Sequence, residues 1–208
     1  SNLFLLVPLY PQYAGSTSAT ALDEAWRWAT VQRNQPELRA IRSFCDLPGY
    51  IEALAASVRE HWREHGRAEH LLLSFHGIPE ANVLKGDPYA RQCERTAQLL
   101  GARLELPASA FSLAYQSRFG RAKWLMPYTS ETLRELARRG VRSVDVMSPA
   151  FAADCLETLE EMAVENRAVF LESGGGEYRF IACLNDRDDH VGMMAQIVCG
   201  AGSFASRA

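Results

Sequence analysis

The sequence lacks the features that mark several classes of protein. Its longest apolar run, Leu3 to Leu9, is interrupted by Pro8 and is too short to span a bilayer. Lys and Arg form no block, and 22 of them against 25 Asp and Glu give a formal net charge of −3. Nucleic acid is therefore a poor candidate ligand, whereas peripheral contact with a membrane stays open.

The five cysteines follow neither a disulfide pattern nor a metal-binding pattern. Their number is odd and no CxxC spacing occurs, so the sequence indicates neither a disulfide framework nor a zinc ribbon. A reducing compartment is expected for such a chain, and the cytoplasm is the natural one.

The first residues indicate an engineered fragment. Ser1-Asn2 is typical of the scar left by tag cleavage, and Leu3 directly begins an apolar strand. Because a domain rarely starts inside its own core, we expect that upstream sequence has been deleted.

Short apolar runs alternate with amphipathic helical stretches, which is typical of βαβ units and a parallel sheet. The run 3–9 is apolar at consecutive positions, as strands buried on both faces are. The expected strands are 3–9, 38–44, 70–75, 111–117, 141–148 and 178–184. The expected helices are 19–32, 48–65, 87–100, 130–139 with Ser130 as N-cap, one that starts near Asp154, and 190–199.

In open α/β sheets, functional residues gather beyond the carboxyl ends of the strands. The residues that this rule selects are His76, Arg118, Phe119, Phe151, Asp154 and Glu157.

His76 lies in the turn His-Gly-Ile-Pro, directly after the strand 70–75. A neutral imidazole can bind a borderline metal or accept a proton at pH 7. Gly77 permits the close approach of a planar ligand, and Pro79 rigidifies the chain that leaves the turn. From position alone, a structural histidine with satisfied hydrogen bonds is the alternative.

Glu157, Glu161 and Glu165 recur every four residues, which places three carboxylates about 6 Å apart on one helical face. Inside a cleft, such a row could pass hard cations or drain protons. A solvated acidic face is the simpler interpretation, and Asp154 has a similar simple interpretation as a helix N-cap.

Trp124 and Phe119 are able to stack on a macrocycle, although aromatic residues near strand ends belong more often to the core. His61 and His65 lie one helical turn apart, but the zinc-protease pattern requires Glu where Trp62 stands. We therefore expect this histidine pair to be solvated.

Six motifs, in order over nearly the whole chain, resemble those of the ferrochelatase family, enzymes that insert iron into porphyrin. The motifs are PLYPQYAGST (8–17), SFHGIP (74–79), GDPY (86–89), YQSRFG (115–120), WLMPYTSETL (124–133) and PAFAADCLETLEE (149–161).

The resemblance implies an α/β, three-layer chelatase-like fold, with a parallel four-stranded sheet flanked by helices as the second of two similar lobes. The porphyrin would lie in the cleft between the lobes. Residues 1–36 would be the end of a truncated first lobe and residues 37–184 the second lobe. Residues 185–208 would form a helix and tail that pack towards the first lobe.

The resemblance also assigns roles to residues. The family's catalytic histidine and glutamate fall on His76 and Glu157. The acidic row attributed to metal or proton transit falls on Glu161 and Glu165. The candidate metal ligands are therefore His76, Glu157, Glu161 and Glu165. The candidate porphyrin contacts are Phe119, Trp124, Phe151 and Asp154. Many relatives carry His where this chain has Cys155, which puts a metal route through that position in doubt.

The implied function is that of a heme-biosynthesis lyase, which inserts Fe(II) into protoporphyrin IX and releases two protons. Iron is then a substrate and no prosthetic group is implied. Some ferrochelatases hold an iron–sulfur cluster near the C-terminus, but only Cys199 lies there, so no cluster is predicted. The alternatives are a chelatase for coproporphyrin or cobalt, and a non-catalytic metal- or tetrapyrrole-binding domain. The fragment alone is expected to be inactive.

Overall fold

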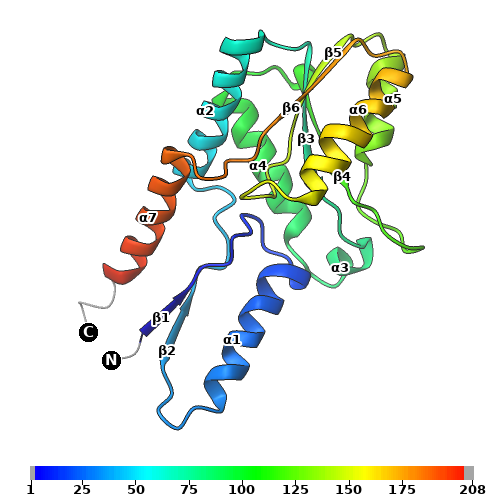
Figure 1. The fold of residues 1–208 in the computed structure, drawn as a ribbon. Coiled ribbons are helices and arrows are strands. Elements are labelled where there is room, and N and C mark those ends of the chain that lie inside the picture. Colours follow the sequence, from blue (N-terminus) through cyan, green and yellow to red (C-terminus); the bar gives the residue numbers. More distant parts are fainter. Residues whose placement is uncertain (1–2, 204–208) are drawn as a thin grey trace.

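The computed structural model describes residues 3–203, in which two regions are distinct (Figure 1). A four-stranded sheet with helices on both faces forms the larger region. A two-stranded sheet with one helix forms the smaller region, near both ends of the chain.

The larger sheet is parallel throughout, with the strand order β4-β3-β5-β6. Its strands are β3 (His70–His76), β4 (Phe111–Gln116), β5 (Ser143–Met147) and β6 (Glu177–Ile181). Because all pairs are parallel, the carboxyl ends of the strands lie at one edge of the sheet.

Helices cover both faces of this sheet, which confirms the expected three-layer α/β architecture (Figure 1). The helices on one face are α2 (Pro48–His65) and α4 (Tyr89–Arg103), and those on the other are α5 (Thr129–Arg138) and α6 (Asn166–Glu172). Alternate residues of β3 serve the two layers, since Leu71 and Leu73 pack with α2 and α4 whereas Leu72 packs with α5 and α6. Each leucine buried in this way contributes about 2 kcal/mol.

The remaining elements are short or peripheral. They are β1 (Leu3–Leu6), the π-helix η1 (Gly15–Ala19), α1 (Thr20–Thr30), β2 (Glu37–Ala40), α3 (Glu80–Leu84), the 3₁₀-helix η2 (Ala108–Ala110), the π-helix η3 (Glu157–Glu165) and α7 (Asp188–Ser203). The helix α7 packs against α2. Within residues 3–203 no helix is long and apolar enough to cross a membrane.

The expectation that the first strand is buried on both faces is wrong. β1 pairs only with β2, and Phe4 is 47% exposed although its ring meets Trp28 of α1 edge-on. An apolar run becomes a buried strand only where neighbours cover both of its faces, and β1 has one neighbouring strand. The expected division at residue 36 separates β2 from its partner β1, and that division stays a prediction.

Two expected helix N-caps are also wrong. The helix α5 begins at Thr129 without a side-chain cap, so Ser130 lies inside it. Asp154 precedes its helix instead of capping it, because η3 begins at Glu157.

The expectation that His61 is solvated is wrong as well, because this side chain lies against the buried carboxylate of Asp145. Asp145 is fully buried in β5 and accepts hydrogen bonds from the Trp62 indole at 2.7 Å and from Arg179 Nε at 2.8 Å. The distance from its carboxylate to His61 Nε2 is 3.3 Å. Burial lowers the pKa of His61, and the charge of Asp145 opposes this shift. The carboxylate thus joins α2 and β6 to β5.

We predict that Asp145→Ala destabilises the protein by about 3–5 kcal/mol, because the largely buried Arg179 guanidinium and the Trp62 indole lose their buried acceptor. The free energy of unfolding from a urea titration measures this loss. Asp186→Ala, at an exposed position, is the matched control and should change stability by less than about 0.5 kcal/mol. Equal stabilities of the two variants would contradict the prediction.

Candidate active site

The parallel pairing of the sheet brings three chain segments together at its carboxyl edge. His76 ends β3 and pairs with Gln116, the last residue of β4. The neighbouring strand β5 ends at Met147 and leads into the segment that carries Phe151 and Glu157. The expectation that these groups rise at the same edge is confirmed.

A cavity of about 810 Å³ lies at this edge, and it is termed the large cavity below. Its walls come from three parts of the chain, namely the segment 9–17, the turn after β3 together with Trp124, and the segment 150–157. The residues that line it are Leu9, Tyr10, Gln12, Ala14, Ser16, Thr17, His76, Gly77, Ile78, Pro79, Asn82, Tyr89, Trp124, Ala150, Phe151, Ala152, Ala153, Cys155 and Glu157.

The ring of His76 is held in one orientation. Its Nδ1 lies 2.6 Å from the carbonyl oxygen of Gly77. Because a carbonyl only accepts hydrogen bonds, Nδ1 carries the hydrogen and Nε2 of the neutral ring keeps a free lone pair. That lone pair can accept a proton or bind a metal ion.

Two aromatic rings flank the imidazole. The ring centroids of Trp124 and Phe151 lie 6.3 Å and 6.2 Å from that of His76. Gly77 makes this packing possible, because a Cβ atom there would lie 3.0 Å from both Trp124 Cε3 and the Gln116 carbonyl oxygen. The large cavity therefore combines apolar walls with one imidazole.

Glu157 is exposed at the start of η3 and lines the same cavity. Its pKa lies below the usual carboxyl value, chiefly because the Cys155 thiol donates a hydrogen bond to it, and His76 acts in the same direction. Burial raises the pKa of Cys155, and Glu157 adds to this rise. The carboxyl of Glu157 is thus ionised and the thiol protonated at neutral pH.

Asp154 does not line the large cavity and instead fixes the segment before η3. Its carboxylate accepts hydrogen bonds from Asn185 Nδ2 at 2.7 Å, Thr158 Oγ1 at 2.9 Å and the Cys183 backbone at 3.3 Å. Burial would raise its pKa, but the hydrogen bonds from Asn185, Cys183 and Thr158 outweigh burial and lower it.

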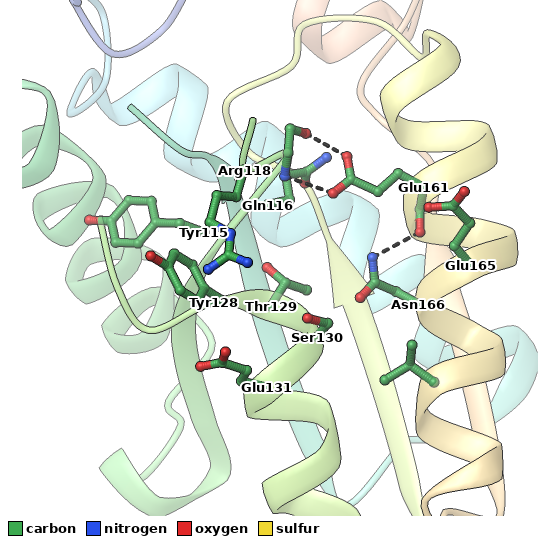
Figure 2. Close-up of a pocket in the computed structure, with 12 residues that line it drawn as sticks. Tyr115, Gln116, Arg118, Tyr128, Thr129, Ser130, Glu131, Glu161, Glu165 and Asn166 are labelled. Carbon is green, nitrogen blue, oxygen red and sulfur yellow. Dashed lines mark hydrogen bonds between the residues drawn. The ribbon is translucent and has the colours of Figure 1, made fainter. Parts of the chain in front are cut away.

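Glu161 and Glu165 line a second cavity of about 260 Å³, termed the acidic cavity (Figure 2). Glu161 reaches across to the end of β4, where it accepts hydrogen bonds from the backbone and hydroxyl groups of Ser117. On the opposite side, the Arg118 guanidinium lies 4.7 Å above the Tyr128 ring. The three glutamates of the predicted row therefore line two cavities, with Glu157 in the large one.

Phe119 lies outside both cavities and is 81% exposed. Of the four candidate porphyrin contacts, Trp124 and Phe151 line the large cavity with His76 and Glu157. The catalytic and binding roles of all these residues stay predictions.

Sequence reasoning missed two features of this site. The segment 9–17 forms part of the wall of the large cavity, and Gln116 lies beside His76 at the end of β4. The motif PLYPQYAGST was the signal for the first, although it was assigned no role in a site. For Gln116, the signal was a polar residue at the last position of an apolar strand, where a buried amide must find partners.

We predict that Cys155→Ala raises the pKa of Glu157 towards the usual carboxyl value, because the main hydrogen-bond donor is lost. In the parent, the depressed pKa of Glu157 adds stability to the folded state, and this stability is lost as the pH falls through that pKa. In the variant the pKa is less depressed, so Glu157 protonates at a higher pH. NMR titration of 13C-labelled glutamate carboxyls measures the change. Cys155→Ser keeps a donor and is the control, and an unshifted titration in Cys155→Ala would contradict the prediction.

Comparison with known proteins places this site in a family. The ferrochelatase family model matches residues 2–201. The ferrochelatase of Azoarcus sp. (strain BH72) is 57% identical over 187 residues, which are 90% of this chain and 52% of the relative. That of Aeromonas hydrophila is 50% identical over 95% of this chain and 61% of its own length. The chain spans about half the length of the curated relatives it matches.

A solved structure shares the fold. SirB from Bacillus subtilis with Fe3+ superposes with a TM-score of 0.62 over 98% of this chain and 74% of its own, at 12% identity. At that identity the likeness concerns the fold alone. The sequence relatives and the family model decide the assignment: the chain belongs to the ferrochelatase family.

Proposed function

We propose that the whole protein containing this chain inserts Fe(II) into protoporphyrin IX in the cytoplasm and releases two protons. The observation that supports this most is that His76 and Glu157 line one cavity with aromatic walls. The curated relatives carry the name ferrochelatase, which agrees with this chemistry.

Metallation requires groups that accept the two pyrrole protons and hold the incoming ion near the ring centre. His76 is suited to both tasks, because its Nε2 lone pair is free. Glu157 is suited to the same tasks, because its exposed carboxyl is ionised at neutral pH, the form that binds a metal ion or accepts a proton. The two residues would act on one macrocycle from the walls of the large cavity.

The flat macrocycle would lie against Trp124 and Phe151, whose rings flank His76. Clamping between two walls would bend the ring and expose its nitrogen atoms, a use of binding energy as strain. Phe119 stays a candidate contact through its exposed ring, and Asp154 would act indirectly by holding the segment before Glu157.

Glu161 and Glu165 would provide a route for metal ions or protons. They follow Glu157 on the same π-helix and line the acidic cavity beside the large one. Carboxylates one turn apart attract hard cations and pass protons over short distances.

The division of the chain and the absence of a prosthetic group belong to the same proposal. Residues 1–36 would end the first lobe, residues 37–184 would form the second, and residues 185–208 would pack towards the first. No iron–sulfur cluster is proposed, and the visible absorption spectrum of anaerobically purified protein tests this.

The alternatives differ in substrate or in class. A chelatase for coproporphyrin or cobalt would prefer these substrates in an absorbance screen of tetrapyrroles with Fe(II), Co(II) and Zn(II). A non-catalytic tetrapyrrole- or metal-binding domain would bind ligands without turnover.

We predict that His76→Ala and Glu157→Gln each reduce porphyrin metallation by the whole protein by roughly 100-fold or more, because each removes a proton acceptor. Initial rates measured from porphyrin absorbance check this. Glu160→Gln, on an exposed position of the same helix, is the control and should retain the parent rate. Undiminished turnover in both variants would refute the catalytic roles.

We predict that the 208-residue chain alone turns over less than about 1% as fast as the whole protein, a loss on the scale of removing a catalytic group. The reason is that residues beyond this chain would supply the facing wall of the porphyrin cleft. The same absorbance assay compares the two proteins at equal concentration. Comparable rates would show that this chain holds the complete site.

A further inference from the structure

Gln116 links the two residues on which the proposed function depends, through its backbone on one side and its side-chain carboxamide on the other. Gln116 is 3% exposed at the end of β4. Its backbone carbonyl accepts a hydrogen bond of 2.8 Å from the amide of Gly77, the residue that follows His76. Its side-chain Nε2 donates a hydrogen bond of 3.4 Å to the backbone carbonyl of Glu157.

The orientation of this carboxamide follows from its partners. The Glu157 carbonyl only accepts, so the NH₂ group of Gln116 faces it and the oxygen faces the other way. On that side Ser74 Oγ donates to Gln116 Oε1 at 2.9 Å and Ser148 Oγ donates at 3.1 Å. Thr129 Oγ1 lies 2.7 Å from Ser74 Oγ and completes the chain of hydroxyl groups.

These partners are as buried as Gln116 itself. Ser74, Ser148 and Thr129 are at most 2% exposed, and they come from β3, the segment after β5 and the start of α5. A buried network of this kind is rigid only when all its members are satisfied. Gln116 has both of its polar side-chain atoms hydrogen-bonded, and it is the member that contacts Glu157 at the start of η3.

Gln116 is not among the residues that line the large cavity, although it borders the acidic cavity (Figure 2). An effect of this residue on the macrocycle in the large cavity must therefore pass through another residue. The path is short, because the side chain of Gln116 contacts the first residue of η3 and its backbone carbonyl contacts the turn after β3.

We propose that Gln116 is a positioning residue that fixes the start of η3, and with it Glu157, relative to the turn of His76. This inference rests on the proposed function of that site. Gln116 holds the distance between the two proton-accepting groups and does not line the cavity proposed for the macrocycle. A displacement of Glu157 would slow the chemical step and leave the binding of the macrocycle nearly unchanged.

Gln116→Met in the whole protein tests this role, because it keeps the volume and removes both side-chain hydrogen bonds. The expected result is a kcat for porphyrin metallation reduced about tenfold or more, with the porphyrin KM within about twofold of the parent. Ser112→Ala is the matched control, because it removes a partly buried hydrogen bond to His70 from the opposite end of β4. It should leave kcat at the parent value.

A double-mutant cycle separates positioning from a general loss of structure. If Gln116 acts through Glu157, Gln116→Met should have little further effect on the residual turnover of Glu157→Gln. A merely structural role would lower turnover by the same factor in both backgrounds, and that result would overturn the inference. A kcat equal to that of the parent in Gln116→Met would overturn it too.

Gln116→Glu provides a second test, which decides if the Met variant fails to fold. A carboxylate at this position accepts from Ser74 and Ser148 but cannot donate to the Glu157 carbonyl, so the same loss of kcat is expected. If the proposed function of the site is wrong, the result differs, because Glu157→Gln then metallates porphyrin at the parent rate. Loss in Glu157→Gln together with full activity in both Gln116 variants would remove only the positioning role.

Discussion

The parallel pairing of β3 with β4 and β5 is the constraint on which the rest of the structure depends. It brings the ends of three strands to one edge, although the residues that follow them are far apart in the sequence. His76 follows directly, since it is the last residue of β3 and lies opposite Gln116. A shift of one residue in this register would turn the apolar side chains of β3 to the wrong layers, so the core and the site are fixed together.

The candidate site consists of accessible side chains and of buried groups that orient them. Glu157 is exposed and His76 is partly exposed, so both side chains are accessible from the large cavity. The groups that orient them are buried, and they include the Gly77 carbonyl behind the imidazole and the Gln116 carboxamide behind η3. Asp154 adds a tether from the other side by binding Asn185. Buried hydrogen bonds of this type are costly to leave unmade, so they hold an exposed side chain in place.

The π-helix η3 connects two cavities with different linings. Glu157 lines a large cavity with apolar walls, whereas Glu161 and Glu165 line a smaller cavity with polar walls. An apolar cavity suits a flat macrocycle, and a row of carboxylates suits an ion or a proton. The two linings are those that the proposed chemistry requires, in which a metal ion and a tetrapyrrole would approach through neighbouring cavities.

The sequence by itself determined the parallel α/β class, the bounds of α2, and the placement of His76 and Glu157 after strand ends, because periodicity and strand-end position are local properties. Only the tertiary structure decided the exposure of β1, the contact of His61 with Asp145 and the role of the segment 9–17 as a cavity wall. It also separated Glu161 and Glu165 from the large cavity. These outcomes depend on which distant residues come to lie beside a given side chain, and one strand or helix does not encode its neighbours.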